Sequence, residues 1–295
     1  MNNRSSLLNR IWLAAVIILG SFFVYCEITA FITPLFMVHP NSDAEAEARV
    51  ASISNVSSVS ISSGGYTLSG YFLDRESSDD LIIFFGGISE NAALDMERFL
   101  GYEEDGYFTD YDIAIVDWPG YGRSEGRAAE ESLKNAACDI VSYFSGRGRL
   151  YIMAYSMGTG PATYAASRCG CDGLVLIAPY ESALDLYNAV VNIFHGPFKQ
   201  LLTYKMETGS FAASVDVVPL IIAGTSDSRV PYESSVSLAM DFPAGCEFAS
   251  FEGLTHGELP DSAAVLERIS TYLDKGTASL SNFQKQKRTM RSMIL

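Results

Sequence analysis

The sequence predicts a doubly wound α/β fold, in which a mostly parallel sheet is covered by helices on both faces. Short apolar runs recur along the chain, and segments of helical length separate them. Continuous apolar runs of strand length are typical of strands buried on both faces. Their alternation with helices indicates a parallel sheet. With 295 residues, of which 48% are hydrophobic, the chain is long enough for one large domain and an appendage.

A β-hairpin is expected to open this domain. Residues 56–61 and 66–73 have strand character and flank the turn Ser62-Ser63-Gly64-Gly65. The later apolar runs of strand length follow at 81–85, 113–116, 150–153, 174–178, 220–223 and 248–251. We therefore expect a single α/β domain over residues 55–274.

The chain before this domain carries a long apolar run. Residues 11–32 are interrupted only by Glu27 and a few small or polar side chains. At about 1.5 Å per residue, such a run is long enough to cross the hydrocarbon layer of a membrane as a helix. We expect residues 1–32 to be a cytoplasmic stub and a transmembrane anchor. A cleaved signal peptide is the alternative, although Ile28-Thr29-Ala30 is a poor cleavage site.

The charges on either side of the apolar run predict its orientation. Arg4 and Arg10 precede it, whereas Asp43, Glu45 and Glu47 lead the charges that follow. Basic residues favour the cytoplasmic side, so we expect a single-pass membrane protein with a cytoplasmic N-terminus. The domain would then lie on the outer side, which could be periplasmic, lumenal or extracellular.

The remaining segments are a connector and a basic tail. Residues 33–54 are polar and are expected to be a short connector. Residues 275–295 form a tail with several basic residues between Lys285 and Arg291. The tail is either a solvated end or a contact for anionic lipid headgroups. The formal charge of the whole chain is −15, which disfavours nucleic acid as a partner.

Polar side chains and glycines follow the predicted strands, at the edge where ligands bind in sheets of this class. A hydroxyl, a carboxylate and an imidazole are among them. In chain order these residues are Gly86-Gly87-Ile88, Asp117, Ser156, Pro179-Tyr180, Asp227 and His256. These three groups together indicate nucleophilic catalysis, because a serine needs a base within hydrogen-bond reach and the base needs an orienting acid.

Ser156 is the candidate nucleophile. It lies in Ala154-Tyr155-Ser156-Met157-Gly158, after a predicted strand and before a small-residue helical stretch. A sharp turn between a strand and a helix lifts a serine hydroxyl above the sheet edge and requires small neighbours two positions away. Gly158 meets that requirement, and Ala154 departs from it by one methyl group. Taken alone, the pentapeptide also fits an ordinary turn serine.

His256 is the candidate base, because it follows the last strand in a loop that contains glycine. His39 lies in the connector, and His195 lies in an aromatic, proline-containing stretch. Asp227 is the candidate acid, since it leaves the strand that precedes the His256 strand. Asp117 is its rival, but it opens a glycine-rich turn and is expected to accept hydrogen bonds that hold that turn.

From about residue 56 to residue 273, the sequence resembles the α/β-hydrolase superfamily. The closest resemblance is to its membrane-anchored, serine-peptidase-like and esterase-like branch without a large lid. The motifs that carry it are Phe85-Gly86-Gly87-Ile88, residues 117–126, residues 154–158, residues 224–231 and His256. The order nucleophile, acid, base is that of this fold family. The resemblance implies a catalytic triad of Ser156, Asp227 and His256.

The resemblance also implies that the backbone amides of Met157 and Ile88 bind the oxyanion. Two fixed donors aimed at the developing charge stabilise the transition state, and Met157 would also lie at a helix N-terminus. The sequence departs from its relatives in two places. Gly86-Gly87 stands where they often have His-Gly, which leaves the donor amide intact. Ala154 stands where they have glycine.

We therefore predict a membrane-anchored serine hydrolase that cleaves a carboxylic ester or thioester through an acyl-enzyme. Two alternatives remain: an amide- or peptide-bond hydrolase of the aminopeptidase type, and a non-catalytic binding module on the same fold. The expected substrate is a small-molecule or lipid-like acyl compound. Apolar side chains between Pro179 and Pro219 either line an acyl groove or pack on the sheet. No cofactor is expected, and no metal, because the histidines and cysteines lack ligand spacing.

Overall fold

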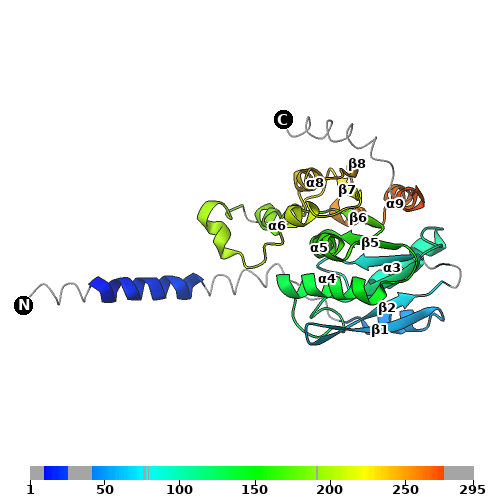
Figure 1. Ribbon diagram of the computed structural model, residues 1–295, viewed down its shortest axis with the longest axis horizontal. Coiled ribbons are helices and arrows are strands. Elements are labelled where there is room, and N and C mark those ends of the chain that lie inside the picture. Colours follow the sequence, from blue (N-terminus) through cyan, green and yellow to red (C-terminus); the bar gives the residue numbers. More distant parts are fainter. Residues whose placement is uncertain (1–9, 26–41, 76–77, 79, 191, 276–295) are drawn as a thin grey trace, which may run out of the picture.

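A computed structural model describes residues 10–25, 42–75, 78, 80–190 and 192–275 of the chain (Figure 1). Its centre is an eight-stranded sheet with the order β1-β2-β4-β3-β5-β6-β7-β8. The predicted hairpin is present as β1 (Val56–Ser63) and β2 (Tyr66–Leu73), which pair antiparallel. β2 also pairs antiparallel with β4 (Asp112–Val116). The sheet therefore starts with an antiparallel edge.

The rest of the sheet is parallel. β4 pairs with β3, and β3, β5, β6, β7 and β8 follow one another across the sheet. These strands are β3 (Leu81–Phe85), β5 (Leu150–Tyr155), β6 (Gly173–Ile177), β7 (Leu220–Gly224) and β8 (Glu247–Phe251). β3 to β7 have almost wholly buried residues, as expected for strands covered on both faces. The predicted α/β fold class is confirmed.

Helices cover both faces of the sheet, and alternate strand residues face the two layers. Ile83 and Phe85 of β3 belong to the core formed with α4 (Glu130–Phe144), α5 (Thr159–Cys169) and α8 (Tyr232–Ala239). Ile82 and Phe84 belong to the opposite core, with α3 (Ala92–Glu104) and α9 (Ala263–Lys275). The period of two along a strand explains this division.

Shorter elements complete the domain near the ends of the parallel strands. The helices α6 (Ala183–Val190) and α7 (Thr208–Ala212) and the 3₁₀ helix η2 (Gly196–Leu201) lie between β6 and β7. Two further 3₁₀ helices follow strands directly, η1 (Ser156–Gly158) after β5 and η3 (His256–Glu258) after β8. Because β3, β5, β7 and β8 run parallel, the loops that follow them lie at the same edge of the sheet.

The predicted transmembrane helix and membrane topology are wrong. No helix among the described residues is long and apolar enough to cross a bilayer. The described residues 10–25 form a helix. Residues 26–32 of the predicted span lie outside the described residues. The assignment of a single-pass protein with a cytoplasmic N-terminus and an outer domain is therefore corrected.

The described part of the predicted connector contains α2 (Ala44–Ala51). Asp43 caps this helix, because its carboxylate accepts hydrogen bonds from the amides of Glu45 and Ala46. Ala46 and Val50 are fully buried in the core shared with α3. Residues 33–41 of the connector and residues 276–295 of the basic tail lie outside the described part of the chain.

Candidate active site

Ser156 lies at a sharp turn between β5 and η1. Its φ is +54°, a left-handed conformation that residues other than glycine seldom adopt. Such strain persists only where the surrounding structure enforces it, and it is concentrated at functional sites. The turn leaves the Ser156 hydroxyl 2.9 Å from Nε2 of His256.

The small residues two positions before and after Ser156, Ala154 and Gly158, have different surroundings. A Cβ atom on Gly158 would lie 2.4 Å from the carbonyl oxygen of Phe85 and 2.6 Å from that of Gly86, so only glycine fits there. Ala154 pairs with Phe85 on one side and Leu176 on the other. Its side chain is fully buried in the core, which accommodates the extra methyl group. The departure at Ala154 therefore leaves the turn intact.

His256 bridges the other two members of the predicted triad. Its Nδ1 lies 2.7 Å from Oδ2 of Asp227, and its Nε2 contacts Ser156 as described above. The side chain of His256 is 9% exposed and that of Asp227 only 2%. The hydroxyl of Tyr155 donates to the carbonyl oxygen of His256 at 3.0 Å, which fixes the backbone of this loop against β5.

Asp227 is oriented by its own turn. Its Oδ1 accepts hydrogen bonds from the amides of Arg229 at 2.8 Å and Val230 at 2.9 Å. Because these bonds use one carboxylate oxygen, the other is directed at the imidazole. The structure thus brings Ser156, His256 and Asp227 into one hydrogen-bonded chain.

Asp117 has the role that the sequence predicted for it. Its carboxylate accepts from the amides of Ala92 at 2.7 Å and Arg123 at 3.2 Å, and so it joins the loop after β4 to the start of α3. Burial raises the pKa of Asp117 to about 6. His195 is exposed and contacts Asn192, and His39 lies outside the described residues.

The two amides predicted to bind an oxyanion belong to residues that line the same cavity as Ser156 and His256. Met157 is the second residue of η1, and Ile88 follows the glycines after β3. The amide of Gly87 has another partner, because it donates to Oε2 of Glu90 at 2.6 Å. The next residue in this loop, Ile88, lines the cavity, and its amide is the one expected to donate a hydrogen bond there.

A cavity of about 300 Å³ opens beside Ser156. α6 supplies much of its apolar wall, and Tyr187 and Tyr204 line it although each is almost fully buried. Its lining residues are Ile88, Ser156, Met157, Ala183, Leu186, Tyr187, Val190, Tyr204, Ser228, Arg229, Val230 and His256. Residues of the segment between Pro179 and Pro219 thus both pack in the core and line the cavity. That the cavity binds an acyl group stays a prediction. This cavity suits a small, largely apolar group.

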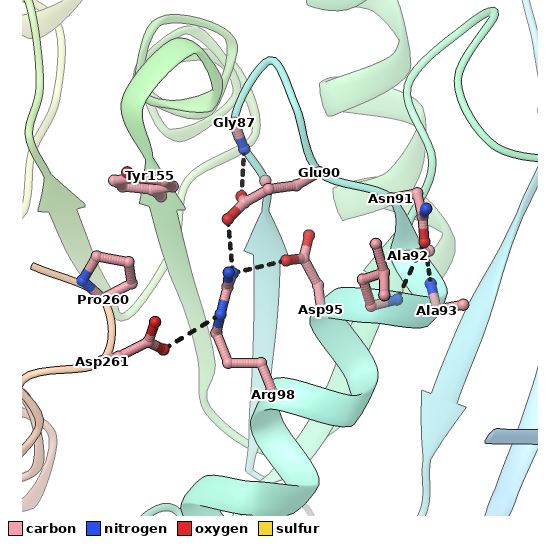
Figure 2. Close-up of polar contacts among 12 residues, drawn as sticks. Gly87, Glu90, Asn91, Ala92, Ala93, Asp95, Arg98, Tyr155, Pro260 and Asp261 are labelled. Carbon is pink, nitrogen blue, oxygen red and sulfur yellow. Dashed lines mark hydrogen bonds and ion pairs between the residues drawn. The ribbon is translucent and has the colours of Figure 1, made fainter. Parts of the chain in front are cut away.

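A cluster of charged side chains near the cavity was missed in the sequence. Glu90, Asp95 and Asp261 surround Arg98, as Figure 2 shows. The available signal was the spacing of Asp95, Arg98 and Tyr102, which places three polar groups on one face of a helix. Their partners after β8, Pro260 and Asp261, lie far away in the sequence, so the spacing alone could not identify them.

Comparison with known proteins agrees with this fold. Residues 80–217 match the family model described as alpha/beta hydrolase fold. The chain is 25% identical over 183 residues to the alpha/beta hydrolase domain-containing protein aho-3 of Caenorhabditis elegans, a match covering 59% of this chain and 52% of that protein. It therefore spans about half the length of this curated relative.

Solved structures show the same architecture. An esterase of Pyrococcus furiosus superposes with a TM-score of 0.65 at 15% identity, over 82% of this chain and 99% of that one. An alpha-beta hydrolase of Vibrio vulnificus gives a TM-score of 0.63 at 17% identity, over 83% of this chain and 91% of the other. The sequence match over residues 80–217 and the solved structures thus agree on an α/β-hydrolase fold.

Proposed function

We propose that the protein is a serine hydrolase that cleaves a carboxylic ester or thioester through an acyl-enzyme. The observation that carries the proposal is the hydrogen-bonded chain from Asp227 through His256 to Ser156, with distances of 2.7 and 2.9 Å. An aspartate, an imidazole and a hydroxyl in this order can activate the hydroxyl oxygen as a nucleophile. The esterase named among the structural neighbours is consistent with such an activity.

In the first half of the proposed reaction, Oγ of Ser156 attacks the substrate carbonyl carbon while Nε2 of His256 takes the hydroxyl proton. Asp227 stabilises the imidazolium that forms, and the amides of Met157 and Ile88 stabilise the negative charge on the carbonyl oxygen. The tetrahedral intermediate then expels the alcohol or thiol, which takes the proton from His256. The acyl group remains bound to Ser156.

In the second half, a water molecule attacks the acyl carbon and gives its proton to His256. Collapse of the second intermediate releases the carboxylic acid and returns the proton to Ser156. The acyl group would occupy the apolar cavity of about 300 Å³. We expect short acyl chains to be preferred, because longer ones would extend beyond its walls.

Labelling with a fluorophosphonate probe tests this proposal directly. The wild-type protein should be labelled at Ser156, and Ser156→Ala should abolish labelling. For hydrolysis of p-nitrophenyl esters, kcat of Ser156→Ala should be lower than that of the wild type by a factor on the order of 10⁶. Ser167→Ala is the matched control, because Ser167 lies on α5 and only donates to the carbonyl oxygen of Tyr164.

A series of p-nitrophenyl esters of increasing chain length, run beside aminoacyl anilides, separates the possible substrates. Faster turnover of short esters than of anilides would support the proposal. Faster turnover of anilides would assign the protein to the amide hydrolases. A folded wild-type protein that reacts with the probe no faster than Ser156→Ala would contradict a catalytic role altogether.

A further inference from the structure

Four side chains with charged groups meet beside the loop after β3, which comprises residues 86–90. Arg98 of α3 is at their centre. Its Nη1 donates to Oε1 of Glu90 at 2.6 Å and to Oδ1 of Asp95 at 2.8 Å, and its Nε lies 3.3 Å from Oδ1 of Asp261 (Figure 2). The side chains of Asp95 and Glu90 are only 3% and 11% exposed. Water screens the contacts of Arg98 with these two carboxylates poorly, whereas the side chain of Asp261 is 57% exposed.

Glu90 also contacts the backbone of Gly87, three residues earlier in the same loop. While Oε1 binds Arg98, Oε2 accepts the amide hydrogen of Gly87 at 2.6 Å. From the other side, Nε1 of Trp118 donates to the carbonyl oxygen of Gly86 at 3.1 Å. The single peptide unit between Gly86 and Gly87 is thus held at its carbonyl oxygen by Trp118 and at its amide by Glu90.

The packing around Gly86 supports the same conclusion. A Cβ atom there would lie 2.5 Å from Oδ2 of Asp95 and 3.2 Å from Oε2 of Glu90. Only glycine allows the backbone to approach these carboxylates so closely. Arg98 compensates the negative charge that this approach brings together.

The same cluster reaches the loop that carries His256. Arg98 pairs with Asp261, and the hydroxyl of Tyr102 donates to the carbonyl oxygen of Pro260 at 2.8 Å. Pro260 and Asp261 follow η3, whose first residue is His256. One face of α3 therefore contacts both the loop of residues 86–90, which contains Ile88, and the segment that follows His256.

We propose that Glu90, held by Arg98, is a positioning residue that turns the amide of Gly87 away from the cavity and so presents the amide of Ile88 to the oxyanion. This inference rests on the proposed function, since it assigns a role in the same reaction. Glu90 acts only through the backbone that it orients. Its effect should therefore appear in the transition state, where the oxyanion carries charge, rather than in substrate binding.

Glu90→Gln is the informative variant because it keeps the shape of the side chain. A glutamine has one oxygen and one NH₂ group, whereas Glu90 uses both oxygens as acceptors. Its NH₂ group must therefore face either the Gly87 amide or the Arg98 guanidinium, both of which are donors. One of the two contacts that define the position of the loop is lost in either orientation.

We expect kcat of Glu90→Gln for p-nitrophenyl acetate to fall at least about tenfold, with KM changed less than about threefold. Complete loss of one oxyanion donor costs about 10²–10³-fold in kcat. Glu103→Gln is the matched control: Glu103 is also on α3 and pairs with an arginine, Arg75, but does not contact the loop. Its kinetics should match those of the wild type. Glu90→Gln with a kcat within twofold of wild type would overturn the proposal.

Hydrogen–deuterium exchange provides a readout that does not depend on turnover. Exchange in peptides covering residues 86–90 should be faster in Glu90→Gln and unchanged in Glu103→Gln. Unchanged exchange there, or an equal increase throughout the domain, would refute a local positioning role even if the wild type proved inactive. An inactive wild type would by itself contradict only the proposed hydrolase activity.

Arg98→Lys supplies the same tests if Glu90→Gln does not fold. A lysine keeps the positive charge, but its single ammonium group cannot reproduce the spread of the guanidinium towards both Glu90 and Asp261. We expect a smaller fall in kcat and faster exchange in residues 86–90 and 256–261. Wild-type kcat and exchange in Arg98→Lys would count against the proposal.

Discussion

At the scale of single residues, the proposed chemistry depends on how one carboxylate divides its hydrogen bonds. Oδ1 of Asp227 accepts hydrogen bonds from the amides of Arg229 and Val230, and Oδ2 bonds with Nδ1 of His256. With an ionised carboxylate at Nδ1, the neutral imidazole carries its proton on Nδ1. Nε2 is then free to accept the proton of Ser156.

Asp227→Asn should move the proton of the neutral imidazole from Nδ1 to Nε2. The asparagine oxygen can keep the two amide bonds, so its NH₂ group would face Nδ1 and force the imidazole proton onto Nε2. The wrong tautomer cannot accept a proton from Ser156, and kcat should fall by about 10⁴-fold, with little change in stability. Steady-state hydrolysis and thermal unfolding measure the two effects.

Asp216→Asn is the control for this substitution, because Asp216 is an exposed residue before β7. It should behave as wild type in both measurements. Retention of more than about one-tenth of wild-type kcat in Asp227→Asn would rule out Asp227 as the group that orients the base.

At the scale of elements, a buried aspartate, Asp117, joins the segment after β4 to the start of α3 by hydrogen bonds. Asp117 is 7% exposed and accepts backbone hydrogen bonds from Ala92 and Arg123. Burial nevertheless dominates, and it raises the pKa of Asp117 from 3.8 to about 6. The folded protein therefore binds the proton of this group more tightly than the unfolded chain does.

The stability of the fold should depend on pH through Asp117. Since the pKa is raised on folding, the stabilisation is largest below about pH 4 and is lost as the pH rises towards about 6. Relative to Asp117→Asn, which cannot ionise, the wild type should lose about 2 kcal/mol of unfolding free energy between about pH 4 and pH 7. Urea unfolding of both proteins across this range provides the test. A constant difference would show that the pKa is not raised.

At the scale of the whole molecule, α2 lies outside the predicted domain boundary at residue 55 yet contributes to the core. Ala46 and Val50 have no exposed surface, and Arg49 pairs with Glu97 of α3. The helix covers part of the sheet face on which α3 and α9 also pack. Its removal would expose apolar residues of α3 and β1.

Two truncated chains test where the domain begins. A chain starting at residue 42 should unfold at the same temperature as the full-length protein. A chain starting at residue 55 should be less stable by at least about 2 kcal/mol, since it loses a buried valine and a capped helix. Equal stability of the two truncated chains would favour the boundary at residue 55.

Local patterns in the sequence were sufficient to predict the fold class and the candidate triad. Buried parallel strands must be continuously apolar, and the run at residues 81–85 coincides with β3 for that reason. Ligand-binding residues follow such strands, so Ser156, Asp227 and His256 could be proposed from their positions after strands alone. The chain order of these residues then indicated the family.

The tertiary structure alone decided which groups come within hydrogen-bond distance. Asp117 and Asp227 both follow strands, and the folded geometry shows that the carboxylate of Asp227 reaches His256, whereas that of Asp117 binds the amides of Ala92 and Arg123. The contact of Arg98 with Asp261 was likewise not evident in the sequence. Contacts between residues distant in the chain depend on side-chain direction and packing, which periodicity along one segment does not specify.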